Sequence, residues 1–428
     1  MSEVGRAIET VWKLESTRLI AAIARVTRDI GLAEELAQDA LLAALERWPT
    51  EGIPENPAPW LMTVAKRRAI DNLRRGQMLL QKHAELAREL QAQQESLGKA
   101  MDGALDQVID DDVLRLIFTA CHPALTMEGR VALTLRLIGG LTTAEIARAF
   151  LAPEKTIGQR IFRAKKTLAE AQVAFETPRG EDLHRRLQSV LSVIYLIFNE
   201  GHTATAGGEW MRASLCEEAL RLGRMLARLL PGESEVHALL ALMEFNAART
   251  AARRGSNGEA VLLPDQDRSL WDPARLQHGL AALEQAQRLG GGSKPYALQA
   301  AITACHMRAR TAEETDWNRI VLLYDTLLQT APSPVVSLNR AVAVGMAQGP
   351  AAGLDALGGA AALSGHHLFH SVRADFLNRL GRLPEACEEL QRALASTQNL
   401  REQEMLAARL KHLQESTQAK QNAGIYRS

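Results

Sequence analysis

The sequence has few aromatic residues, 4% of its 428 positions, and no surplus of charge, since 50 Lys and Arg balance 50 Asp and Glu. A net charge of zero says nothing about nucleic acid, so only local basic clusters can indicate it. The commonest residues, which include Ala, Leu, Arg and Glu, favour helices. The sequence therefore predicts an all-α fold, with two or three domains because the chain is too long for one core.

Cysteines and long apolar runs are also scarce. The four cysteines lie far apart and form no CxxC pair, so neither a zinc site nor a disulfide framework is indicated, as is typical of a protein of the reducing cytoplasm. Because no run of about 18 apolar residues occurs, we expect no membrane span. We also expect no cofactor, no metal site and no catalytic residues, since neither a nucleophile elbow nor a phosphate loop is present.

Residues 141–169 carry the clearest motif, LTTAEIARAFLAPEKTIGQRIFRAKKTLA. Thr142 and Glu145 have the spacing of a capping box, and Pro153 suits the first position of a second helix. That second helix places Ile157, Ile161, Ala164 and Leu168 on one face, with Lys155, Gln159, Arg163 and Lys166 opposite and Thr156 and Arg160 beside them. Two short helices with one basic outer face indicate a DNA-binding helix-turn-helix rather than an ordinary amphipathic helix.

Two further helices of opposite charge precede it. Residues 32–48 (LAEELAQDALLAALERW) form an amphipathic helix with an acidic face, which suits either solvent or a basic partner. A loop with four prolines follows, and Trp60 begins a helix, WLMTVAKRRAIDNLRR, in which five basic residues oppose one acid. A stiff loop, an aromatic residue and a basic helix suit a nucleic-acid strand, although Trp60 alone would more often be a core residue.

These three stretches, in this order, resemble an extracytoplasmic-function (ECF) RNA polymerase sigma factor over residues 10–172. The resemblance implies sigma region 2 at 10–77, an acidic linker at 78–111 and region 4, with the helix-turn-helix, at 112–172. It implies core RNA polymerase and promoter DNA as partners, with polymerase contacts at the β′ clamp helices and the β flap.

The resemblance also implies roles for individual residues. The polymerase-binding positions are Glu35, Asp39 and Trp48. The positions that melt and hold the −10 strand are Asn56, Trp60, Lys66, Arg67, Arg68, Asn72, Arg74 and Arg75. The positions that read the −35 element are Thr156, Gly158, Gln159, Arg160, Arg163 and Lys166. Gly158 stands where the family often has a polar residue, and Arg67 stands where many members have Asn.

The linker becomes acidic at Asp102, Asp106 and Asp110–Asp112. Two interpretations remain open for it. The first is a solvated helical linker whose charges repel one another. The second, implied by the resemblance, is an acidic strand that occupies a polymerase channel built for RNA.

The last 250 or so residues are predicted to be helical throughout. Residues 373–394 (RADFLNRLGRLPEACEELQRAL) have the small residues of a tetratricopeptide (TPR) repeat, including Gly381, and Gly349 lies 32 positions earlier. This spacing predicts an α-solenoid of TPR-like helix pairs at 180–415. The chain resembles the ECF subfamily with such an extension, of which YLIFNEGH (195–202) and LLPDQDRSLWD (262–272) look typical. A peptide or protein is the expected ligand of the solenoid.

The sequence thus predicts an alternative sigma factor that directs promoter-specific transcription initiation and carries a C-terminal domain regulating it in cis. The alternative is a helix-turn-helix regulator with a repeat-based sensor domain that never binds polymerase. The basic helix at 60–75 argues for the sigma factor, because a plain regulator has no use for a second strand-capturing element.

Overall fold

The computed structural model describes residues 3–80, 105–150, 152–202, 213–253, 255, 261–397 and 400–425. All regular secondary structure in these residues is helical, which confirms the predicted all-α class. The chain divides into two compact units, residues 1–197 and residues 198–428.

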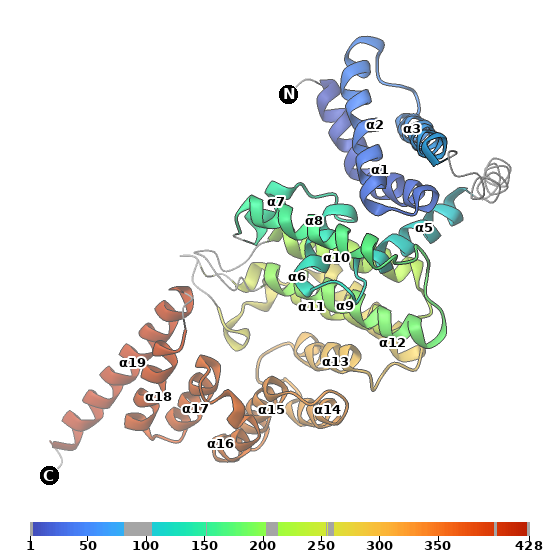
Figure 1. The fold of residues 1–428 in the computed structure, drawn as a ribbon. Helices are drawn as coiled ribbons and strands as arrows, with labels where there is room; N and C mark the ends of the chain where they lie inside the picture. Colours follow the sequence, from blue (N-terminus) through green and yellow to red (C-terminus); the bar gives the residue numbers. More distant parts are fainter. Residues whose placement is uncertain are drawn as a thin grey trace. The chain divides into compact units, whose positions relative to one another are not determined.

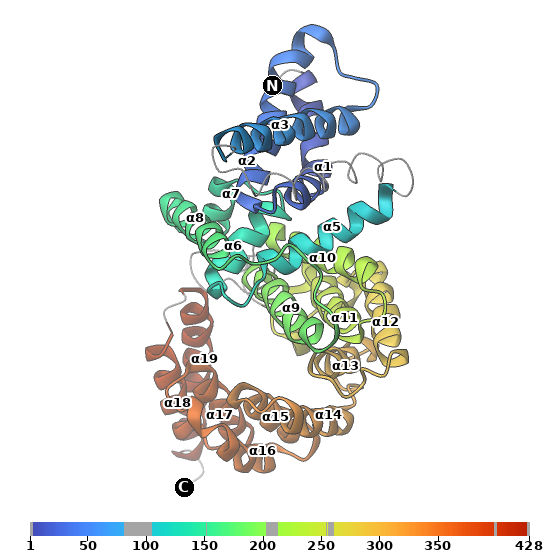
Figure 2. The ribbon, with the colours of Figure 1, turned by 45° about the vertical axis from the view of Figure 1, so that its right-hand side comes forward.

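The first unit begins with three helices, α1 (Glu3–Thr27), α2 (Ile30–Glu51) and α3 (Pro57–Leu80). In both views α1 and α2 run side by side (Figures 1 and 2). The loop between α2 and α3 is shorter than predicted. Helix α2 continues through Pro49, and α3 begins at Pro57 rather than at Trp60. Pro57 is tolerated in the first turn of α3 because its missing N–H has no partner there, whereas Pro49 lies in the last turn of α2.

Four helices follow in the same unit, α5 (Leu105–Ala120), α6 (Met127–Leu137), α7 (Thr143–Ala149) and α8 (Glu154–Glu170). The capping box of α7 is present, since Thr142 Oγ1 accepts from the Glu145 amide at 3.1 Å and Glu145 Oε2 accepts from the Thr142 amide at 2.7 Å. The apolar stripe predicted for α8 is buried. Helix α8 begins at Glu154, one residue later than predicted, so Pro153 occupies the N-cap position and makes no side-chain capping bond.

The predicted acidic linker is partly helical. Helix α5 begins at Leu105, so Asp110 and Asp111 lie on it and are exposed. Asp112 is 1% exposed and forms ion pairs with Arg25 and Arg115. Its charge is therefore part of the first unit's interior rather than of a solvated linker. Residues 81–104, including Asp102, lie outside the described residues, as does the side chain of Asp106.

Helix α9 (Gly180–His202) reaches further into the first unit than the sequence suggested. Ser189 Oγ donates to the carbonyl of Cys121 at 2.6 Å, and Arg186 donates to the carbonyl of Phe118 at 3.3 Å. These bonds connect α9 to the last turn of α5 and to the residue that follows it. The division between the units therefore falls after Ile197, not at residue 180.

The second unit is a succession of helices that confirms the predicted helical pattern. Its α-helices are α10 (Ala213–Leu229), α11 (Ser234–Ala248), α12 (Pro273–Arg288), α13 (Pro295–Arg308), α14 (Trp317–Thr330), α15 (Pro334–Ala347), α16 (Pro350–Ala356), α17 (His367–Arg379), α18 (Leu383–Ala395) and α19 (Leu400–Ile425). Short 3-10 helices are η1 (Ala251–Arg253), η2 (Leu263–Asp265), η3 (Arg268–Leu270) and η4 (Leu357–Leu363). Both views show α14 to α19 following one another as stacked neighbours (Figures 1 and 2).

Small residues let these helices approach closely, as TPR-like packing requires. A Cβ added to Gly345 or to Gly353 would lie 2.3 Å and 2.6 Å from the ring of Phe376. Gly349 and Gly381 lie in the turns before α16 and α18. Their φ angles of 99° and 78° belong to the left-handed region of backbone conformation, which favours glycine. Ala386 and Ala393 are fully buried at the α17–α18 contact.

The polar motifs of the second unit serve its architecture. Asp272 caps α12 by accepting from the amides of Ala274 and Arg275. Arg268 donates to the carbonyls of His306 and Ala309, both at 2.7 Å, and lies over the Trp271 ring. His202 is buried against Phe198. Asp272, Arg268 and His202 are residue types that also occur in acid–base catalysis. Their contacts here show that each of them stabilises the fold.

Candidate nucleic-acid and polymerase interface

The outer face of α8 is exposed where the sequence predicted base contacts. Gln159, Arg163 and Lys166 are exposed, whereas Thr156 and Arg160 are half-buried at the edge of the face. Lys166 also pairs with Glu170 at 3.6 Å. Arg and Gln side chains on such a face can bind base edges, and Lys can bind phosphate.

Gly158 lies on the same helix in a half-buried position. A Cβ added there would meet only the Thr143 methyl, at 4.0 Å. Packing therefore does not demand glycine at this position. The glycine leaves an open place on the recognition face where a side chain could reach DNA.

Phe162 is a residue of this face that the sequence interpretation missed. Its ring is 66% exposed and lies next to Arg163 on the outer side of α8. An exposed phenyl group has no stabilising contact to offer the fold, but it can pack on the methyl group of thymine in the major groove. Helical spacing places Phe162 on the same side as Gln159 and Lys166 and away from Ile161. This spacing could have predicted its exposure from the sequence.

A cavity of about 420 Å³ adjoins α8 at the first turn of α6. Arg160 and Arg163 line it from α8, and Thr126 and Gly129 line it from α6. Thr126 caps α6 by accepting from the Gly129 amide at 3.2 Å. Two guanidinium groups thus lie beside a helix N-terminus, where Glu128 of the same turn supplies one opposing charge.

The second basic cluster lies on α3. Arg67, Asn72 and Arg74 are exposed, and Asn56 is exposed in the loop before the helix. Burial lowers the pKa of Lys66, and the Arg25 guanidinium acts in the same direction. The side chain of Arg75 lies outside the described residues.

The two tryptophans of this region pack on each other. Their ring centroids are 5.4 Å apart with an edge-to-face geometry, and Trp48 is 2% exposed. Trp48 therefore cannot offer its side chain to polymerase and instead anchors α2 on α3. Trp60 is half-buried, so part of its ring remains available to a partner.

The acidic face of α2 contains the other two predicted docking residues. Glu35 is exposed and Asp39 is half-buried. The carboxylate of Asp39 lies 3.0 Å from the guanidinium of Arg68 on α3. A predicted polymerase-docking position and a predicted −10 position thus share an ion pair, which solvent weakens because both side chains are partly exposed.

Three family models match the chain. Sigma-70 region 2 matches residues 14–78, Sigma-70 region 4 matches residues 115–168, and a family of unknown function (DUF6596) matches residues 186–287. An uncharacterized protein of Rhizobium meliloti is 43% identical over 92% of this chain and 93% of its own length. The ECF RNA polymerase sigma factor SigK of Mycobacterium ulcerans is 33% identical over 36% of this chain and 78% of its own length. SigK of Mycobacterium tuberculosis is 32% identical over the same shares.

The chain belongs to the ECF sigma factor family. No solved structure matches it significantly. As an alternative sigma factor it directs transcription initiation, and its two sigma domains bind core RNA polymerase and promoter DNA. The matched residues of region 2 lie on α1–α3, those of region 4 lie on α5–α8, and the DUF6596 match runs from α9 to α12.

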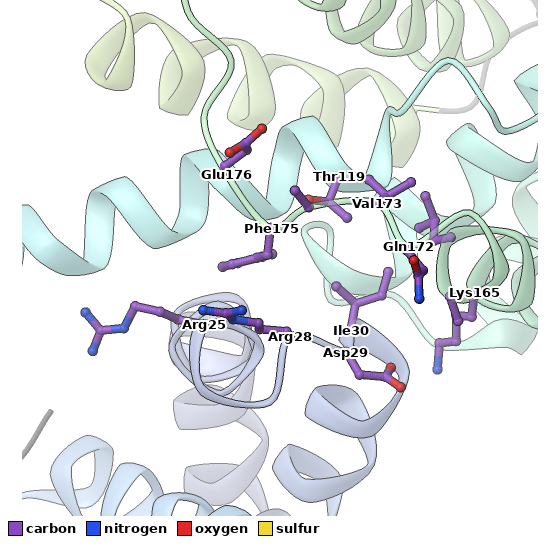
Figure 3. Close-up of a pocket in the computed structure, with 13 residues that line it drawn as sticks. Arg25, Arg28, Asp29, Ile30, Thr119, Lys165, Gln172, Val173, Phe175 and Glu176 are labelled. Carbon is purple, nitrogen blue, oxygen red and sulfur yellow. The ribbon is translucent and has the colours of Figure 1, made fainter. Parts of the chain in front are cut away.

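Within the first unit of this sigma factor, regions 2 and 4 meet at a seam that encloses a cavity of about 780 Å³. Figure 3 shows Arg25 and Arg28 from the end of α1, Lys165 from α8, and Phe175 from the segment after α8 around it. Ile30 lines the cavity from the start of α2. The seam is therefore incompletely packed.

Among the described residues, no group of three or more His, Cys, Asp or Glu side chains is arranged to hold a metal ion. In the same part of the chain, no helix combines the length and apolar character needed to cross a bilayer.

Proposed function

We propose that this sigma factor binds its partners through three surfaces of the first unit. The acidic face of α2, with Glu35 and Asp39, docks on the β′ clamp helices of polymerase. The loop before α3 and the basic face of α3 hold the −10 strand. The outer face of α8 reads the −35 element, and region 4 contacts the β flap. The observation that carries the proposal is the exposure of both basic faces in one unit.

The −10 surface uses the exposed residues of α3. Arg67 and Arg74 suit phosphates, and Asn72 suits a base edge. The half-buried ring of Trp60 offers an unpaired base one stacking surface, supported from below by Trp48. Trp48 thus acts by positioning Trp60 rather than by touching polymerase.

The second unit regulates the sigma domains in cis and adds a contact that initiation requires. A peptide or protein ligand is supported by a cavity of about 250 Å³ in this unit, whose apolar lining includes Trp317, Tyr324 and Met346. A stop codon after His202 keeps α9 with the first unit. We expect this truncation to lower promoter-specific transcription, because a tethered second contact acts at high effective concentration. A truncated protein more active than the full chain would instead indicate that the second unit masks the sigma domains.

The protein itself is not an enzyme and acts in the cytoplasm, where polymerase performs the chemistry. The rival function, a regulator that never binds polymerase, uses α8 but not α2 or α3. Run-off transcription with purified core polymerase on fragmented genomic DNA separates the two. The sigma factor yields specific transcripts that Arg67→Ala reduces, while a plain regulator yields none.

A further inference from the structure

The cavity of about 250 Å³ in the second unit lies among η3, α13, α14 and α15. Both views show these three α-helices as consecutive neighbours (Figures 1 and 2). Polar and apolar side chains line the cavity, among them Arg268, His306, Trp317, Tyr324, Asn339 and Met346. Arg268 comes from the motif LLPDQDRSLWD at 262–272. The cavity thus involves a motif that takes no part in the two sigma domains.

Arg268 is held in one orientation by three contacts. Its Nη1 atom donates to the carbonyls of His306 and Ala309, and its guanidinium lies 4.7 Å from the centre of the Trp271 ring. Both hydrogens of Nη1 are therefore used, whereas Nε and Nη2 have no hydrogen-bond partner among the described residues. These two nitrogens form an edge of arginine that can bind a carboxylate through two parallel hydrogen bonds. The side chain is fixed in place while this edge remains unused.

The charge of the cavity is positive. Burial lowers the pKa of His306 to about 4, and the guanidinium groups of Arg249 and Arg268 act in the same direction, so its imidazole is neutral at pH 7. Among the described residues that line the cavity, Arg268 is then the one that carries a charge. Glu313 and Glu314 also act on Arg268, but both are exposed and neither lines the cavity. The cavity therefore favours an anionic group.

Much of the remaining wall is aromatic or apolar. Trp317 packs edge-to-face on His306 with ring centroids 5.1 Å apart, and Tyr324 and Met346 line the same cavity. Met346 is 40% exposed, so solvent reaches the cavity at α15. The volume is smaller than that of sites that enclose drug-sized ligands. It suits a single aromatic ring or branched apolar side chain.

We propose that this cavity binds a carboxylate attached to an aromatic or branched apolar group. Arg268 binds the carboxylate, and Trp317, Tyr324 and Met346 surround the apolar part. A free organic acid and the last residue of a peptide both have this chemistry. The inference deepens the proposed function by naming the ligand chemistry of the second unit, and it rests on that function only for the effect of the ligand on transcription.

The test measures binding to the full chain by isothermal titration calorimetry, without polymerase or DNA. The probes are 3-phenylpropanoate and 3-phenylpropanamide, which differ only in the group that meets Arg268. Asn339→Asp adds a negative charge at the cavity with almost no change of shape, and Asn339 is exposed. Asn378→Asp, exposed on α17 and outside the cavity, is the matched control. Arg268→Gln removes the carboxylate partner.

We expect 3-phenylpropanoate to bind with a Kd in the millimolar range or below, and about tenfold more tightly than 3-phenylpropanamide. Asn339→Asp should weaken binding of the acid about fivefold and leave binding of the amide unchanged. Arg268→Gln should abolish the preference for the acid, and Asn378→Asp should have no effect. A general loss of packing would not reproduce this pattern, because it affects both probes alike.

The peptide N-acetyl-Gly-Gly-Phe distinguishes the two sources of the carboxylate. If it binds more tightly than 3-phenylpropanoate and amidation of its last residue removes the gain, the ligand is the end of a peptide. If it binds equally or more weakly, the ligand is a free acid.

Two results would overturn the site. One is that the acid and the amide bind equally, or that neither binds. The other is a preference for the acid that Asn339→Asp and Arg268→Gln both leave unchanged while thermal unfolding shows both variants folded. A protein that binds the acid as expected, but whose promoter-specific transcription is unaffected by the stop codon after His202, contradicts the proposed function and not the site.

Discussion

The contact between regions 2 and 4 and the contacts between helices of the second unit are built from different chemistry. At the first, Glu34 meets Arg136 and Lys165, and a cavity remains beside them. In the second unit, the Phe376 ring fills the space left by Gly345 and Gly353. The first contact depends on charges that water can solvate equally well after opening, and the second depends on shape.

This difference indicates which parts of the molecule move during function. Close packing of an aromatic ring on glycines is lost if the helices separate by even a small distance. Ion pairs across a polar seam exchange their partners for water, DNA phosphates or a protein surface at modest cost. We therefore expect the second unit to work as one body and the first unit to work by opening.

The largest expected effect concerns the packing of the second unit. Gly345→Val places a β-branched side chain against the Phe376 ring and should lower the free energy of unfolding by roughly 2–3 kcal/mol. Hydrogen exchange in α15–α17 of the full chain, followed against urea, measures it. Gly358→Ala is the control, because no atom lies within 4 Å of the added Cβ. Equal loss in both variants would show that the ring contact is not what holds these helices.

The outer face of α8 should give the opposite result, a loss of binding without loss of stability. Arg163→Ala should weaken binding to the cognate −35 element by about 1–3 kcal/mol. Binding is measured by gel shift on DNA recovered from the run-off experiment, with Arg179→Ala, exposed beyond α8, as the control. Unchanged binding would remove Arg163 from the recognition surface.

Acid should weaken the second unit through two buried histidines. Burial lowers the pKa of His202 to about 2 and that of His306 to about 4. Below about pH 6.5 both histidines are protonated in the unfolded chain but remain neutral in the folded protein. The free energy of unfolding therefore falls by up to about 1.4 kcal/mol per pH unit for each histidine. The contribution of His306 ends near pH 4. Urea titrations between pH 7.5 and 5 should show a smaller loss in His306→Gln than in His278→Gln, whose side chain is exposed.

The smallest effect concerns Phe162. Replacing the exposed ring by alanine should leave stability unchanged and cost about 1 kcal/mol at a site with thymine under the ring, and less where uracil removes the methyl group. Competition gel shifts with thymine and uracil duplexes compare the two. An equal loss on both duplexes would mean that Phe162 does not read the methyl group.

Local pattern predicted much of this structure. The capping box of Thr142 and Glu145 and the apolar stripe of α8 follow from spacing over a few residues, and both are present. The helical character of the second unit was also predicted, because it follows from local composition and spacing. The prediction of a long proline-rich loop was wrong at Pro49 and Pro57, because both prolines lie inside the end of a helix.

Contacts between distant positions could not be predicted. Glu34 belongs by spacing to the solvated acidic face of α2, yet its partners lie 102 and 131 positions away. Asp112 is the last residue of the acidic run Asp110–Asp112, which the sequence assigned to a linker, but its side chain is buried beside Arg25. Trp48 matches a docking position in the family but is covered by Trp60. In each case the deciding neighbour comes from another element of the chain.

The most direct measurement is the distance across the seam when polymerase is bound. Spin labels at Leu14→Cys and Glu170→Cys report the first unit, and labels at Leu322→Cys and Leu368→Cys, both exposed, report the second. On addition of core RNA polymerase we expect a longer first distance and an unchanged second distance. A first distance that stays short in the polymerase complex would contradict this expectation.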